Sequence, residues 1–214
     1  MKNSATTRFC LVRHGETDWN SQKRVQGQID IDLNATGEAQ ARAVRAGLAE
    51  YSFIAAYSSD LLRASRTAQI ATAGFGFVVS LAPALRERHY GQLQGLTPHE
   101  ASTQLPDAHR HRLARTPGYD YESGESLIAF AARVMAGLEL LAARHAGGNV
   151  LAFTHGGVLD IAYRAATGRG LEEPRDFPLQ NAALNWLEFC GGNWRLVSWA
   201  DSRHFQQGLD EVLA

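Results

Sequence analysis

The feature that most constrains the fold of this 214-residue chain is its alternation between short apolar runs and helical patterns. Apolar runs of strand length lie at residues 8–12, 53–57, 77–79 and 149–154. Apolar residues recur at helical spacing at residues 36–48, 61–72, 126–144 and 158–166. Alternation of this kind is typical of parallel sheets, because parallel strands need crossover connections and these are usually helices.

Two further apolar runs, 184–189 and 194–199, flank Gly191, Gly192 and Asn193, which predicts a β-hairpin. We therefore predict an α/β fold, a three-layer α/β/α sandwich with a mostly parallel central sheet and some antiparallel pairing near the C-terminus. The chain length suits one domain, so we expect a single domain over residues 1–214. A lid-like excursion is expected at about 97–125, which alternatively is a plain surface insertion.

Composition excludes several classes of function. The net charge of −1 gives no overall field that would attract nucleic acid or an anionic membrane. No window approaches the roughly 20 apolar residues of a membrane span, and no secretion signal is recognised, so we expect a cytoplasmic protein. Cys10 and Cys190 lie in apolar surroundings and are expected to be reduced core residues. A monomer and a homodimer fit the sequence equally well.

Polar motifs stand where three of the expected strands end. Arg13-His14-Gly15 follows the first strand, Ser58-Ser59 follows the second, and Thr154-His155 follows the strand at 149–154. In parallel sheets, ligands bind outside the carboxyl ends of the strands. We therefore expect these motifs to meet at one edge of the sheet, and we expect Ser58, Ser59 or Asp60 to cap the helix that follows.

Each motif has a chemical interpretation and a structural one. His14 offers a nucleophilic ring nitrogen, Arg13 a fork suited to phosphoryl oxygens, and Arg63 a second such fork in the first turn of a helix. His155, as an imidazolium, would counter phosphoryl charge, and Glu87 would protonate a leaving oxygen. Taken singly, these residues are better explained as hydrogen-bonded histidines, a solvated arginine and a surface acid.

Taken in order, the motifs resemble the histidine phosphatase superfamily, also called the phosphoglycerate mutase-like family. The resemblance is carried by Leu11 to Thr17, by Ser58-Ser59 with Arg63-Ala64, by Leu85-Arg86-Glu87 and by Thr154 to Gly157. It implies that His14 attacks phosphorus and becomes a phosphohistidine.

The resemblance also implies roles for other residues. Arg13, Arg63 and His155 would hold the phosphoryl group, and Glu87 would serve the leaving oxygen as acid and then the attacking water as base. Further positions that match substrate-lining residues of relatives are Thr17, Asn20, Gln26, Gly27, Tyr90 and Gly156. Asn20 and Gln26 are equally well explained as loop-stabilising amides.

We expect no metal and no cofactor. Two arginines and one imidazolium would balance a phosphomonoester of about −1.5 to −2 charge. No His-Glu-x-x-His or paired-cysteine spacing is present. The histidines without a motif are expected at the surface: His99, His109, His111, His145 and His204.

The segment before the long helix favours the phosphatase branch. It is short and ends Glu122-Ser123-Gly124-Glu125-Ser126, and Pro98 stands near where mutases have a lysine. The predicted partner is a small phosphorylated metabolite: a sugar phosphate, a phosphoglycerate or a ribazole phosphate.

Two alternatives stay open. A cofactor-dependent phosphoglycerate mutase would use Arg110, Arg112 and Arg115 to grip a second acidic group. A non-catalytic phospho-ligand-binding protein would be expected to lack His14 or Glu87, and both are present. Tyr119 and Tyr121 either stack on the substrate or pack on the sheet.

Overall fold

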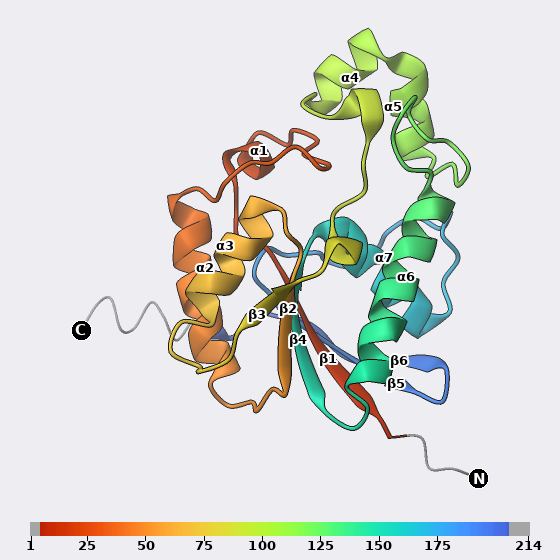
Figure 1. The fold of residues 1–214 in the computed structure, drawn as a ribbon. Helices are drawn as coiled ribbons and strands as arrows, with labels where there is room; N and C mark the ends of the chain where they lie inside the picture. The colour runs from red at the N-terminus through yellow and green to blue at the C-terminus, as the bar shows by residue number, and fades with distance from the viewer. Residues whose placement is uncertain (1–4, 206–214) are drawn as a thin grey trace.

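The computed structural model describes residues 5–205 and contains one six-stranded sheet in the order β3-β2-β4-β1-β5-β6 (Figure 1). The strands are β1 (Thr7–Arg13), β2 (Ala55–Ser58), β3 (Val79–Leu81), β4 (Asn149–Thr154), β5 (Leu184–Cys190) and β6 (Asn193–Asp201). β1 to β4 pair in parallel, whereas β5 is antiparallel to both β1 and β6. The predicted fold class is confirmed.

Helices cover both faces of the sheet, as Figure 1 shows. One face carries α2 (Ala35–Leu48) and α3 (Leu62–Ala71), and the other carries α6 (Leu127–Arg144) and α7 (Gly156–Thr167). Strand β1 contributes to the core on both faces of the sheet, because its successive side chains point to opposite faces. Phe9 and Leu11 belong to the core under α6 and α7, while Cys10 and Val12 belong to the core under α2 and α3.

The excursion rises above the carboxyl edge of the sheet, where Figure 1 draws α4 (Pro98–Gln104) and α5 (Pro106–Leu113). A capping box stands at its start, with Thr97 and Glu100 bonded reciprocally. Tyr119 and Tyr121 pack on each other in a small core of the excursion, away from the sheet. Packing on the sheet is therefore not observed, and stacking on the substrate stays a prediction. The lid function and the single-domain organisation stay predictions.

The shorter elements are α1 (Asp18–Ser21), between β1 and α2, and the 3-10 turns η1 (Pro83–Leu85) and η2 (Gly91–Leu93), which lie between β3 and the excursion. Two of the hairpin tryptophans pack against aromatic residues of the fold. Trp186 stacks on Phe53 with ring centroids 5.9 Å apart, and Trp194 lies 5.5 Å from Phe9.

Several local expectations are wrong, each for a reason the sequence does not display. Ser58, Ser59 and Asp60 do not cap α3. Its N-cap is Leu61, and the Leu62 N–H donates instead to Asp30 at 2.6 Å. Asp60 is turned toward Arg86, with which it forms a two-bonded ion pair.

Burial also differs from expectation at two other positions. Cys190 is exposed, because it ends β5 at the hairpin turn beyond the core. His204 is buried, and one of its ring nitrogens lies 3.0 Å from the Ala182 carbonyl oxygen. Within residues 5–205, none of the helices has the length and apolar character needed to cross a bilayer. The cytoplasmic location and the choice between monomer and homodimer stay predictions.

Candidate active site

The site begins where β1 and β4 end side by side. Arg13 and Thr154 are paired in register, and the His14 N–H extends the ladder to the Thr154 carbonyl at 2.9 Å. The chain then turns closely against α2. A Cβ on Gly15 would lie 2.4 Å from the Gly37 carbonyl oxygen, so only glycine fits. The sheet edge and this turn together fix the direction of the His14 ring.

His14 is buried, and one of its ring nitrogens has a hydrogen-bond partner. Nδ1 lies 2.7 Å from the Gly15 carbonyl oxygen, an acceptor, so Nδ1 carries the proton and Nε2 carries the lone pair. Burial, and next the charges of Arg63 and Arg13, hold the pKa of His14 well below its ordinary value. The ring is therefore neutral at neutral pH, the form in which Nε2 is nucleophilic.

Cationic and donor groups surround this ring. The His155 ring lies 5.2 Å away, centroid to centroid, and one of its nitrogens contacts the Ser59 hydroxyl at 2.8 Å. Arg63 is fully buried and donates to the Gly27 carbonyl at 2.7 Å and the Ile29 carbonyl at 3.0 Å. Arg13 donates to the Leu179 carbonyl.

At this site, three buried nitrogens lack a hydrogen-bond partner within residues 5–205: Nε of Arg13, Nε of Arg63 and Nδ1 of His155. Buried donors are seldom left unpaired, so their clustering at one place indicates a binding site for an oxygen-rich anion. The expected imidazolium at His155 beside a phosphoryl group stays a prediction. Burial, followed by the charges of Arg63, His14 and Arg13, holds the pKa of His155 well below its usual value.

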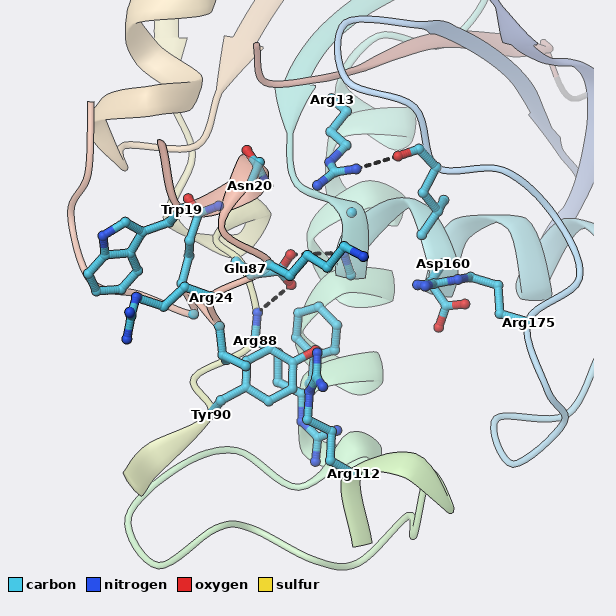
Figure 2. Close-up of a pocket in the computed structure, with 18 of the residues that line it drawn as sticks. Arg13, Trp19, Asn20, Arg24, Glu87, Arg88, Tyr90, Arg112, Asp160 and Arg175 are labelled. Carbon is cyan, nitrogen blue, oxygen red and sulfur yellow. Dashed lines mark hydrogen bonds between the residues drawn. The ribbon is translucent and has the colours of Figure 1, made fainter. Parts of the chain in front are cut away.

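Glu87 follows η1 and reaches the first turn of α7. One carboxylate oxygen accepts from the Arg88 N–H at 2.8 Å, and the other accepts from the Gly157 N–H at 2.9 Å. Figure 2 shows this carboxylate in the middle of the pocket, with the two bonds dashed. A Cβ on Gly157 would lie 2.0 Å from a carboxylate oxygen of Glu87. Gly157 was not among the predicted site residues; the paired glycines at a helix start were its only signal.

The remaining predicted residues fall into two groups. The pocket is lined by Asn20, Gln26, Gly27, Tyr90 and Gly156. Thr17 is fully buried and does not line it. Thr17 and Asn20 form the capping box of α1, which places Asn20 at the pocket wall.

Three of the lining residues have local contacts or environments that matter for the site. Gly27 presents its carbonyl to Arg63. The Gln26 side-chain oxygen is buried and has no partner within residues 5–205. Burial, and next the charge of Glu87, raise the pKa of Tyr90 to about 12, so its hydroxyl stays protonated and can donate.

The pocket has a volume of about 750 Å³, and its wall is rich in cations. They are Arg13, Lys23, Arg24, Arg63, Arg88, Arg112, Arg115 and Arg175. The lining acids are Glu87 and Asp160. Figure 2 shows Arg112 beside Tyr90, and Arg175 on the opposite side near Asp160. Arg110 is absent from the wall, because it is exposed and paired with Asp107.

Lys23, Arg24, Arg88 and Arg175 were not anticipated as pocket residues. Arg175 lies in the irregular segment between α7 and β5, where no periodic pattern announces it. Within the described residues, no group of three or more histidine, cysteine or acidic side chains is arranged to hold a metal ion.

A neutral buried histidine, a cluster of unpaired buried donors that includes two arginines, and a carboxylate in the same pocket define a site for phosphoryl transfer through histidine. The chain belongs to the histidine phosphatase superfamily (branch 1), whose family pattern it matches over residues 9–202. The predictions of this family and of a metal-independent phosphatase within it are confirmed.

Known proteins agree with this assignment. The chain is 39% identical to the metal-independent phosphoserine phosphatase of Arabidopsis thaliana, over 97% of this chain and 89% of the relative. The structure resembles Bacillus stearothermophilus YhfR with a TM-score of 0.87 and 30% identity, covering 92% of this chain and 98% of the other. It also resembles a phosphoserine phosphatase from Entamoeba histolytica, solved in complex with phosphoserine, with a TM-score of 0.81 and 26% identity over 92% and 98% of the two chains.

Proposed function

We propose that this protein hydrolyses a small phosphomonoester that carries a second acidic group, with phosphoserine as the first candidate, through a phosphohistidine at His14. The observation that carries the proposal is the Nδ1 hydrogen bond to the Gly15 carbonyl. It leaves the Nε2 lone pair of a neutral imidazole as the reactive atom, beside Arg13 and Arg63. The same carbonyl stabilises the ring as it gains positive charge during attack.

The proposed reaction has two steps. In the first, the phosphoryl oxygens replace the missing partners of Arg13, Arg63 and His155, and His14 Nε2 forms a bond to phosphorus. The bond from phosphorus to the ester oxygen breaks, and that oxygen takes a proton from Glu87. In the second, Glu87 accepts a proton from water, the resulting oxygen bonds to phosphorus, and the bond to His14 breaks.

The positive charge of the pocket wall supports a substrate with an acidic group. Among the described residues, no carboxylate pairs with Lys23, Arg112 or Arg175, although all three line the pocket. Asp160 does not neutralise them, because it is already bonded to Arg115 and Arg164. A carboxylate on the substrate would find donors here, and the two phosphoserine phosphatases among the relatives act on such an ester by name.

A phosphoglycerate mutase is the second candidate. The observation that favours it is that Arg112 and Arg115 both line the pocket, where they would hold the acidic end of a phosphoglycerate. A mutase would return the phosphoryl group to a second hydroxyl of the same molecule and would not release it to water.

The test is to incubate the protein with phosphoserine or 3-phosphoglycerate in the presence of a metal chelator. Free phosphate and the phosphoglycerate isomer are then measured separately. We expect phosphate release that persists in chelator, is lost in His14→Ala and is unchanged in His99→Ala, an exposed histidine outside the pocket. Isomer formation stimulated by bisphosphoglycerate, without matching phosphate release, would instead establish the mutase.

A further inference from the structure

The segment that carries Glu87 is held from behind by one side chain of α6. Arg133 donates from Nη1 to the carbonyl oxygens of Ala84 at 2.9 Å and Arg86 at 3.1 Å. From Nη2 it donates to the carbonyl of Glu87 itself at 3.2 Å. One guanidinium therefore fixes the path of the backbone on which Glu87 stands.

Arg133 is in turn fixed by Glu125. The pair is bidentate, with Nε 2.7 Å from one carboxylate oxygen and Nη2 2.8 Å from the other. The two side chains are only 25% and 22% exposed. Burial opposes ionisation, but the bonds from Arg133 and from the His89 N–H keep the pKa of Glu125 below its ordinary value. The pair is therefore ionic at neutral pH, where such fork-to-fork bonds are strong and directional.

The pair supports the Glu87 segment on both sides. Arg133 bonds at and before Glu87, and Glu125 accepts from the His89 N–H at 2.9 Å, two residues after it. The Glu125 N–H also donates to the His89 carbonyl at 2.8 Å. Glu125 is the last residue of the excursion, so this contact joins the end of the excursion to the Glu87 segment. Neither Arg133 nor Glu125 lines the pocket, so neither touches substrate.

We infer that Arg133 and Glu125 form a positioning pair for Glu87, which keeps its carboxylate at the site of the leaving oxygen. The inference rests on the proposed role of Glu87 as the acid. The carboxylate end of Glu87 is placed by the N–H groups of Arg88 and Gly157, and the backbone end is placed by the pair. Removing one support leaves the residue present but tilted, and a misplacement of about 1 Å costs on the order of 10²-fold in rate.

The experiment compares two esters that differ in their need for an acid. The alkoxide of phosphoserine must be protonated as it leaves, whereas the phenolate of dinitrophenyl phosphate leaves unaided. The variants are Arg133→Met, Arg133→Lys and Glu125→Gln, all assayed in the full chain. The readout is kcat/KM, which reports the step that forms the phosphohistidine.

We expect Arg133→Met to lower kcat/KM for phosphoserine about 10- to 100-fold and to leave that for dinitrophenyl phosphate within about 3-fold. Glu125→Gln should show the same selectivity more weakly, and Arg133→Lys should recover part of the loss. Arg86→Met is the matched control. It breaks a bidentate pair with Asp60 from the same segment without touching the Arg133 contacts, and both esters should keep their rates.

An equal loss on both esters in Arg133→Met, with circular dichroism showing a folded protein, would make the pair merely structural and overturn the inference. If Arg133→Met does not fold, the lysine variant and Glu125→Gln decide by the same criterion. Glu87→Gln separates this result from a failure of the proposed function. An equal loss on both esters in that variant would remove Glu87 as the acid, and the inference with it.

Discussion

Gly157→Ala should separate catalysis from stability. A Cβ at this position would lie 2.0 Å from a carboxylate oxygen of Glu87 and 3.1 Å from the Phe130 ring. The carboxylate is the mobile partner, so it must leave and give up its 2.9 Å bond to the Gly157 N–H. The helix itself tolerates alanine, which is favoured over glycine by up to about 1 kcal/mol.

A well-placed acid contributes on the order of 10²–10⁴ in rate, so displacing it should lower kcat/KM for phosphoserine about 100-fold. That ratio corresponds to about 2.7 kcal/mol of transition-state stabilisation. The free energy of unfolding, measured in urea, should change by less than about 1 kcal/mol.

Gly168→Ala is the control with the opposite expectation. Its φ of +71° ends α7 in the left-handed region, with open space around it. Alanine there should cost about 1 kcal/mol of stability and leave kcat/KM unchanged. A Gly157→Ala enzyme of full activity would refute the placement of Glu87 against the start of α7.

Three further predictions follow from the same geometry. The acidic limb of kcat/KM should lie below pH 6.5, because the pKa of His14 is well below that ordinary value; a limb at or above pH 6.5 would contradict a neutral buried nucleophile. His14 and His155 bind protons more readily in the unfolded chain, because folding lowers the pKa of both. The free energy of unfolding should therefore fall as pH drops below 6.5, by about 1.4 kcal/mol per pH unit for each imidazole, as measured in urea titrations at successive pH values. Asp160→Ala should destabilise by about 3 kcal/mol, since it strands the buried Arg164, and a change under about 1 kcal/mol would argue against this network.

The sequence predicts the positions of the candidate site residues better than it predicts the contacts that hold them in place. His14, Arg63 and His155 were placed correctly because each follows a strand end or begins a helix, and parallel strands bring those ends to one edge. No local sequence pattern predicts Asp30 as the partner of the α3 N-terminus, because the two residues in contact are 32 positions apart in the chain. The apolar period of the sequence predicts the buried face of α6. It does not predict the role of Arg133 on the same helix, because the partners of Arg133 are backbone carbonyl oxygens.

The charged residues of the pocket likewise include some that the sequence predicts and some that it does not. Arg112 was anticipated, but Arg175 comes from an irregular loop whose path only the fold determines. The low pKa of His155 depends on burial and on neighbouring arginines, neither of which a sequence displays.

The central claim is that the phosphoryl group passes through His14, and trapping it is the most direct test. The enzyme is mixed with radiolabelled phosphoserine, quenched in base within one turnover and mapped by mass spectrometry. We predict a label on His14 that survives base, is lost in acid and is absent from His14→Ala. Turnover with no label on the protein, or with the label on another residue, would contradict the account.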